Sequence, residues 1–132
     1  LKTTFSEKKL TRQINSESVW PCKSKINGFE IHNGQTVLED IQGSLKIKPI
    51  FKDLDLGWYK ENNKGGFIAG TYIHGIFEND SWRVQYINLI RKSKNLPILN
   101  KKSISYKEKR ESIIDNLANE FHKHLNLKSF LS

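Results

Sequence analysis

The sequence predicts an α/β domain whose first half is rich in strands and whose second half contains two helices. Short apolar and β-branched stretches, separated by glycine, proline and asparagine, make up residues 1–77. From residue 79 onward, apolar residues instead recur at helical spacing. The chain has 132 residues, the usual size of one domain, and it shows no internal repeat or low-complexity linker. We therefore expect a single domain.

The first expected strands lie in residues 10–20 and 24–38. Residues 10–20 show no strong helical stripe, and residues 24–38 contain Gly28 and the dipeptide Asn33-Gly34. Because Asn-Gly favours the tight turn of a β-hairpin, we expect one strand to end there and the return strand to begin.

Three further strands are expected before the helices. Residues 44–51 alternate in polarity, and Pro49 suits an edge strand or the end of a strand. Residues 56–66 indicate a short strand followed by an exposed turn. Residues 67–77, with the sequence FIAGTYIHGIF, form the most apolar stretch of the chain. Apolar residues on both faces predict one strand that is covered on both sides.

The two helices are expected to begin at capping residues. Asn79 or Asp80 can cap the first, because a short polar side chain accepts a hydrogen bond from a free backbone N–H group. Ser105 and Glu108 form a capping box for the second. The first helix should bury a stripe made of Trp82, Tyr86, Leu89 and Ile90. A second apolar stripe consists of Ile113, Ile114, Leu117, Phe121 and Leu125.

Composition limits the classes of function. The formal net charge of +8 permits attraction to a polyanion, but the basic residues are scattered and no stripe of interleaved arginine and aromatic residues stands out. Nucleic-acid binding is therefore disfavoured. Cys22 is the only cysteine and cannot form an internal disulfide, which fits the cytoplasm. No apolar run reaches the roughly 18 residues of a membrane-spanning helix.

His74 ends the most apolar stretch and stands just before a helix. Along a regular strand, Tyr72 and His74 share one face, with Thr71 and Ile73 on the other. Sites in open α/β sheets gather at the carboxyl ends of strands, so His74 is a candidate for chemistry. The alternative is a histidine that is hydrogen-bonded within the core.

Glu30 and His32 form a second pair of interest. Their spacing places both on one face of a strand and Ile31 on the other. A carboxylate and an imidazole so arranged can position each other or a substrate. The alternative is the exposed face of an antiparallel strand.

Two motifs together are more specific than either histidine alone. The stretches GFEIHNGQT at residues 28–36 and GTYIHGIFENDSWR at residues 70–83 resemble the C-terminal part of the cobyric acid synthase family. That family carries G-[YF]-E-I-H-x-G-x-T and then G-T-Y-x-H-G-[IL]-F in the same order. Residues 3–13 and 110–131 are also similar to it, so the resemblance covers essentially the whole chain. The amidotransferase of cobyrinic acid diamide synthesis is closely similar, and the E-I-H motif favours cobyric acid synthase.

The resemblance implies a flavodoxin-like fold of the class I amidotransferases. Residues 1–132 would be the C-terminal portion of a single glutaminase domain, with the nucleophile segment and a synthetase domain upstream of residue 1. In the family a cysteine thiolate attacks the amide of glutamine, and a histidine moves the protons. The released ammonia amidates corrin carboxylates that the synthetase domain activates with ATP and magnesium. The resemblance implies no cofactor in this segment. The chain contains no methionine, which also fits part of a longer or processed protein.

Carried over residue by residue, the resemblance makes His74 the glutaminase histidine. Glu30, His32 and Tyr72 are candidate supporting residues in the matching motifs. Many class I amidotransferases have a glutamate two residues after the histidine, but Ile76 stands there, so the third triad member is open and Glu30 is a candidate orienter of His74. Cys22 lacks the G-x-C-x-G setting of the nucleophile, so we expect it to be structural.

Two other functions are kept as alternatives. The chain could be a non-catalytic interaction module that completes a partner's amidotransferase fold, or a basic nucleic-acid-binding domain. The stretch NNKGG lacks the G-x-x-x-x-G-K-[ST] pattern of a phosphate-binding loop, so we expect the chain itself to bind neither ATP nor the corrin.

Overall fold

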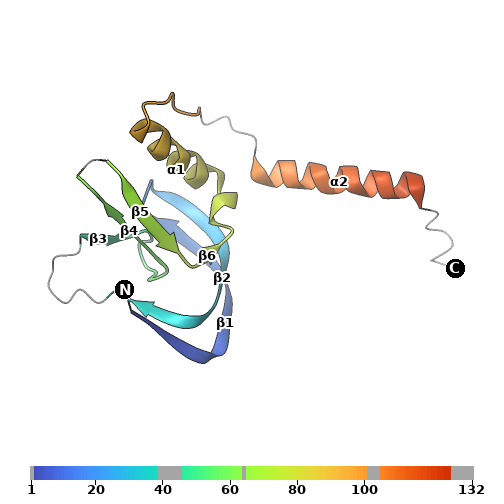
Figure 1. Cartoon of the computed structure of the whole chain (residues 1–132). Helices are drawn as coiled ribbons and strands as arrows, with labels where there is room; N and C mark the ends of the chain where they lie inside the picture. The colour runs from blue at the N-terminus through green and yellow to red at the C-terminus, as the bar shows by residue number, and fades with distance from the viewer. Residues whose placement is uncertain (1, 39–45, 64, 101–104, 126–132) are drawn as a thin grey trace. The chain divides into compact units, whose positions relative to one another are not determined.

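The computed structural model describes residues 2–38, 46–63, 65–100 and 105–125. The chain divides into two compact units, Leu1–Lys101 and Lys102–Ser132. Among the described residues, the first unit contains the strands and one α-helix, and the second contains one α-helix (Figure 1). The predicted strand-rich first half and two C-terminal helices are therefore confirmed.

The described strands of the first unit form two antiparallel sheets of three strands each. One sheet has the order β1-β2-β6, and the other has the order β3-β4-β5. The strands are β1 (Lys2–Ser18), β2 (Ser24–Val37), β3 (Ile47–Pro49), β4 (Gly57–Glu61), β5 (Phe67–Thr71) and β6 (Ile73–His74). Every strand pairing among the described residues is antiparallel, so the parallel sheet that a flavodoxin-like fold requires is not among them.

The expected hairpin turn at Asn33-Gly34 is wrong. β2 passes straight through both residues, and Gly34 pairs with Phe5 of β1. The hairpin between β1 and β2 turns instead in residues 19–23, so the two strands form one long curved ribbon (Figure 1). The irregularity near Asn33 is taken up by β1, whose register shifts between Phe5 and Leu10. Pairing with β1 on both sides of the dipeptide outweighs its local turn preference.

The expectation of one doubly covered strand over residues 67–77 is also wrong. The chain leaves the second sheet after β5 and joins the first sheet as β6, and the change falls at Tyr72. The Tyr72 N–H donates to the carbonyl of Leu56 at 2.8 Å, and the Ile73 N–H donates to the Thr71 hydroxyl at 3.1 Å. One face of β5 is open, because the Ile68 side chain is 81% exposed.

The other predictions for the second sheet are confirmed in part: of the expected strand 44–51, residues 44 and 45 lie outside the described residues, and β3 covers Ile47–Pro49. β3 is an edge strand and ends at Pro49, where a missing N–H group costs no ladder hydrogen bond. Between β4 and β5, the Gly65 N–H donates to the Asn62 carbonyl at 3.2 Å, and Gly65 has a φ of 77°.

The core of the first unit combines buried isoleucine and leucine side chains with a cluster of aromatic rings. Trp20 stacks on Tyr59 with 4.6 Å between ring centroids, and Trp82 stacks on Tyr86 at 5.1 Å. The indole N–H of Trp82 donates to the carbonyl of Trp20 at 3.0 Å, so its polar atom is satisfied in the core. Tyr86 of α1 (Asp80–Ser93) also meets the ring of Phe67 on β5 edge to face, with 5.6 Å between centroids, so α1 packs against the second sheet. Asn79 stands at the predicted N-cap position, but the capping hydrogen bond expected of its side chain is not made. Trp82 of the predicted stripe is buried, but Ile90 is 39% exposed.

The second unit contains α2 (Tyr106–His124). The predicted cap is confirmed, because the Ser105 side chain accepts a hydrogen bond from the Glu108 N–H at 3.4 Å. No residue of α2 is buried. Its apolar stripe is open, with exposed fractions of 57% for Ile113, 57% for Leu117 and 52% for Phe121.

Candidate active site

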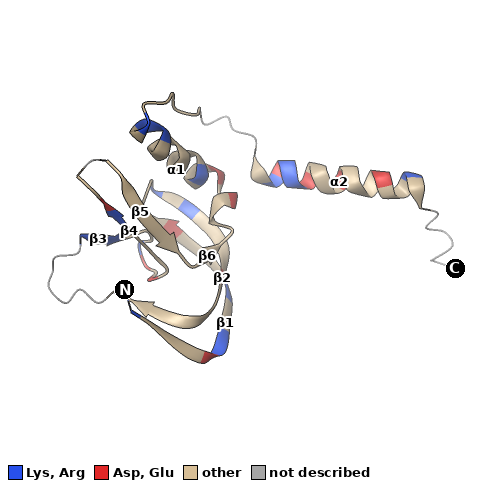
Figure 2. Cartoon of the chain, in the orientation of Figure 1, with Lys and Arg blue, Asp and Glu red and all other residues tan. Residues whose placement is uncertain are grey.

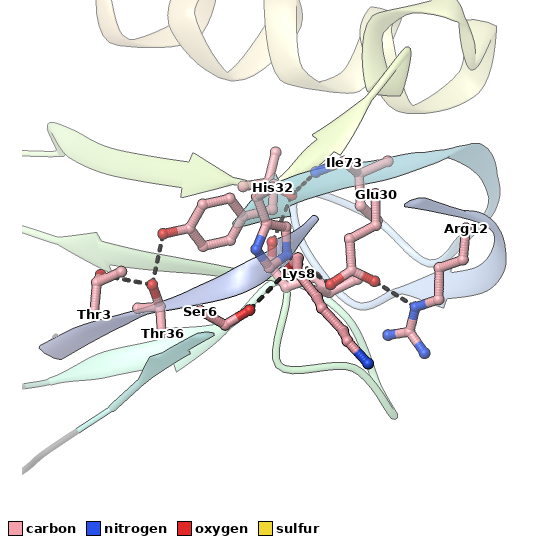
Figure 3. Close-up of polar contacts among 11 residues, drawn as sticks. Thr3, Ser6, Lys8, Arg12, Glu30, His32, Thr36 and Ile73 are labelled. Carbon is pink, nitrogen blue, oxygen red and sulfur yellow. Dashed lines mark hydrogen bonds and ion pairs between the residues drawn. The ribbon is translucent and has the colours of Figure 1, made fainter. Parts of the chain in front are cut away.

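Residues of the two sequence motifs meet in a polar cluster on the face of β2 that carries Glu30 and His32. Glu30 is 2% exposed, and its carboxylate accepts hydrogen bonds from Nε of Arg12 on β1 and from Nε2 of His32, the latter at 2.7 Å (Figure 3). The predicted pairing of Glu30 with His32 is therefore confirmed, and the alternative of an exposed strand face is wrong for Glu30. Arg12 neutralises the buried charge, which would otherwise be costly to remove from water.

The His32 ring carries a second feature of the cluster. Its Nδ1 atom is buried and has no hydrogen-bond partner among the described residues. A proton on Nδ1 would be a buried donor without an acceptor, so this setting favours the tautomer with the proton on Nε2, which donates to Glu30.

Tyr72 joins the second motif to the first. Its ring lies against that of His32 with 4.5 Å between centroids, and its hydroxyl is 2.5 Å from the hydroxyl oxygen of Thr36. Thr36 in turn is 2.7 Å from the hydroxyl oxygen of Thr3 on β1 (Figure 3). A continuous set of polar contacts and one ring contact therefore runs from Arg12 through the motif residues to Thr3.

An open cleft of about 600 Å³ adjoins this cluster. Glu30, His32, Thr36 and Tyr72 contribute to its lining. The cations Lys8, Lys9 and Arg12 and the carboxylate of Asp55 also line it. Since Arg12 is already paired with Glu30, the two lysines leave this part of the surface with an excess of positive charge.

His74 lies on the other face of the same sheet. In the pairing of β2 with β6, Glu30 is opposite Ile73 and Phe29 is opposite His74. Directly opposed residues of an antiparallel pair share a face, so His74 lies beside Phe29 and away from Glu30. His74 is exposed, and Phe29 is 51% exposed. The alternative of a core histidine is therefore wrong.

The structure thus separates residues that the sequence groups together. Glu30, His32 and Tyr72 lie together, whereas His74 does not join them. The prediction that Tyr72 and His74 share a face is wrong, because the strand is interrupted at Tyr72 and strict alternation ends there. Glu30 is directed to Arg12 and His32 and not to His74, so this arrangement does not make Glu30 the orienter of His74.

Three residues of this region carry roles that the sequence did not indicate. Arg12 lies opposite Glu30 because of the register between β1 and β2, which the sequence does not specify. For Thr36 the sequence did contain a clue to its importance, because it is the last residue of the first motif. Gly28 allows β6 to approach, because a Cβ atom there would lie 2.5 Å from the carbonyl oxygen of His74 and 2.5 Å from a methyl carbon of Ile73.

Cys22 lies in the connection between β1 and β2. Its carbonyl oxygen accepts a hydrogen bond from the Ser18 hydroxyl at 2.7 Å, and the residue is half-buried. A strand-to-helix elbow is absent there, because β2 is the next element. A structural role for Cys22 stays a prediction.

Charge, apolar length and the grouping of possible metal ligands add three observations about the described residues. Lys and Arg residues are spread over β1, β2, α1 and α2 and do not gather on one element (Figure 2). Neither α-helix, within its described length, has the apolar length required to cross a membrane. No group of three or more histidine, cysteine, aspartate or glutamate side chains in the described ranges is arranged to hold a metal ion.

Comparison with known proteins identifies the family. Residues 1–82 match the model of the CobB/CobQ-like glutamine amidotransferase domain, a range that contains the first motif and all but the last residue of the second. The whole chain is 86% identical over 132 residues to the cobyric acid synthases of Prochlorococcus marinus strains MIT 9215 and MIT 9301. It is 38% identical over 136 residues to the cobyric acid synthase of Synechococcus sp. strain CC9311.

These similarities cover all of the chain but only part of each relative. The chain spans 26% of the length of all three relatives. No solved structure matches the chain significantly. The match to the domain model covers more than half of the residues. The chain therefore belongs to the CobB/CobQ-like glutamine amidotransferase family.

Proposed function

We propose that this chain is the C-terminal portion of the glutaminase domain of a cobyric acid synthase. The observation that carries the proposal is the high identity to cobyric acid synthases along the whole chain, combined with an exposed His74 in the G-T-Y-x-H-G motif. An exposed imidazole at the end of a strand is open to a second segment that brings a nucleophile. The proposal includes the flavodoxin-like fold, with the nucleophile segment and the synthetase domain upstream of residue 1.

In this proposal His74 moves protons for an upstream cysteine. The cysteine thiolate attacks the side-chain amide carbon of glutamine, and the protonated imidazole gives its proton to the leaving ammonia. A water molecule then gives a proton to the imidazole while its oxygen adds to the thioester carbon, and cleavage of the C–S bond releases glutamate and restores the thiolate beside the protonated imidazole. The ammonia passes to the synthetase domain and amidates carboxylates of the corrin.

The other parts of the proposal concern residues outside this chain. ATP and magnesium would act at the synthetase domain. The complete enzyme would work in the cytoplasm, as expected for a biosynthetic enzyme with one unpaired cysteine in this segment.

The test is His74→Ala in the complete enzyme, assayed with glutamine and separately with ammonia. Glutamine-dependent amidation should fall by several orders of magnitude, as it does when a histidine of a catalytic triad is removed. Ammonia-dependent amidation should remain, because it bypasses the glutaminase. His124→Ala, which removes an imidazole with a 77% exposed side chain from α2, is the matched control and should change neither activity.

Two results would contradict the proposal. Equal loss of both activities in His74→Ala would make His74 a structural residue. Unchanged glutamine-dependent amidation would favour a non-catalytic module that completes the fold of another amidotransferase.

A further inference from the structure

The strand that carries His74 has little backbone pairing of its own. β6 consists of Ile73 and His74, which pair with Glu30 and Phe29 of β2. Gly75 follows with a φ of 78° and leads directly into the short helix η1 (Ile76–Glu78). A two-residue strand supplies few ladder hydrogen bonds. The position of the His74 ring must therefore depend on what fixes the chain before and after it.

The anchor before His74 is the side chain of Tyr72. Its hydroxyl is 2.5 Å from that of Thr36, and its ring lies on His32, so two residues of β2 hold it. His32 is itself fixed by the buried carboxylate of Glu30. Only Ile73, which is 3% exposed, separates this anchor from His74. His32 and Thr36 of the first motif thus hold Tyr72 of the second motif. They do so on the face of the sheet opposite to His74.

The anchor after His74 is the side chain of Asn79. Its Oδ1 accepts from the Asn27 N–H at 2.8 Å, and its Nδ2 donates to the Asn27 carbonyl at 2.9 Å. The same Nδ2 also lies within hydrogen-bond distance of the carbonyls of Gly75 and Ile76, at 3.2 and 3.0 Å. Although Asn79 stands at the N-cap position of α1, its side chain makes no capping hydrogen bond. It connects the start of α1 to β2 instead.

We propose that Tyr72 and Asn79 are positioning residues that fasten both ends of the His74 segment to β2. This inference rests on the proposed role of His74 in glutamine hydrolysis. Neither residue needs to contact glutamine. Their function is to hold the imidazole where it meets a nucleophile supplied by another segment, and a misplacement of about 1 Å can cost roughly 100-fold in rate.

The test uses Asn79→Asp and Tyr72→Phe in the complete enzyme. Aspartate keeps the acceptor for the Asn27 N–H and suits a helix start as well as asparagine does, but it cannot donate to the three carbonyls. Phenylalanine keeps the ring on His32 and loses the bond to Thr36. Each change should lower kcat for glutamine hydrolysis by roughly 10- to 100-fold and leave KM for glutamine unchanged. Ammonia-dependent amidation should be unaffected.

Asn88→Asp provides a matched control on the same helix. Asn88 makes the same two-sided contact with a backbone, accepting from the Leu99 N–H at 2.7 Å and donating to the Leu99 carbonyl at 3.0 Å. That contact lies at the other end of α1 and does not involve the His74 segment. Asn88→Asp should leave the kinetics of glutamine hydrolysis unchanged.

A second set of variants combines each substitution, Tyr72→Phe or Asn79→Asp, with His74→Ala. It separates a positioning role from a general structural role. The readout is the rate at which a diazoketone analogue of glutamine alkylates the nucleophile. If Tyr72 and Asn79 act through His74, their substitution should slow alkylation in the parent enzyme and add no further loss in His74→Ala. An equal further loss in His74→Ala, or wild-type kcat in both single variants, would overturn the positioning role.

The same assays distinguish this inference from the proposed function. If His74→Ala abolishes glutamine hydrolysis while Asn79→Asp and Tyr72→Phe match the parent, only the positioning role fails. If His74→Ala hydrolyses glutamine at the parent rate, the proposed function and the positioning role fail together.

Discussion

His32 and Glu30 are hydrogen-bonded to each other across one pleat of strand β2. The His32 Nε2 atom lies 2.7 Å from a carboxylate oxygen of Glu30, and Glu30 is 2% exposed. Two side chains at this spacing on a strand share a face, and here that face is covered by Tyr72. The contact explains why both polar residues occur in a stretch that otherwise packs against the core.

Arg12 is predicted to stabilise the fold because it compensates the buried charge of Glu30. Arg12→Gln keeps much of the side-chain length but removes the charge, so the free energy of unfolding should fall by about 1–3 kcal/mol. Thermal unfolding of the complete enzyme would measure the change. Lys48→Gln is the control, because the Lys48–Glu61 pair is 4.0 Å apart and exposed, and it should cost at most about 0.5 kcal/mol. Equal effects of the two substitutions would contradict a structural role for the Arg12–Glu30 pair.

Gly28→Ala is predicted to disturb the strand that carries His74. The added Cβ would lie 2.5 Å from the His74 carbonyl oxygen, so the backbone of β2 or β6 must move. We expect a lower melting temperature and a loss of glutamine-dependent amidation. Gly70→Ala is the matched control in β5, where a Cβ would meet nothing within 4 Å. If Gly28→Ala were tolerated as well as Gly70→Ala, the close approach of the two strands would not be required.

Cys22 is predicted to be dispensable for catalysis. Its backbone carbonyl, which Cys22→Ser leaves in place, makes the contact with Ser18. Glutamine-dependent amidation by the complete enzyme should therefore stay within about 3-fold of the parent, as expected for a residue outside the catalytic group. Mass spectrometry after treatment with a glutamine-analogue electrophile gives the complementary measurement. A covalent adduct on Cys22 would show that it is the nucleophile and would overturn the assignment of the site.

The isolated 132-residue chain is predicted to be catalytically silent and to self-associate. We expect no catalysis because the chain supplies the proposed base but has no cysteine in a nucleophile setting. We expect self-association because the apolar stripe of α2 is open, with Leu117 57% exposed. Size-exclusion chromatography with a thermal melt would test this. Leu117→Lys should shift the chain toward a monomer, whereas Asn116→Lys, at the adjacent position of the same helix, should not. A clean monomer of the parent chain with a sharp cooperative transition would contradict the prediction, and measurable glutamine hydrolysis by it would contradict the missing nucleophile.

The sequence by itself determined that strands make up the first part of the chain and two helices the second. Local signals were sufficient where short-range contacts decide the structure, as for the cap at Ser105 and the edge strand that ends at Pro49. The two histidine motifs also indicated the family, because they combine rare residue types in a fixed order. The pairing of Glu30 with His32 followed from the period of two along a strand.

The tertiary structure alone decided how these elements combine. Asn33-Gly34 carries a strong turn signal, but pairing with β1 on both sides keeps it within β2. The interruption at Tyr72 could not be read from an apolar run, because each half of the run pairs with a different sheet. Which face His74 occupies, and that Arg12 meets Glu30, depend on strand register between residues far apart in sequence. Local propensity contains no information about such register, since it is set by the summed packing of both strands.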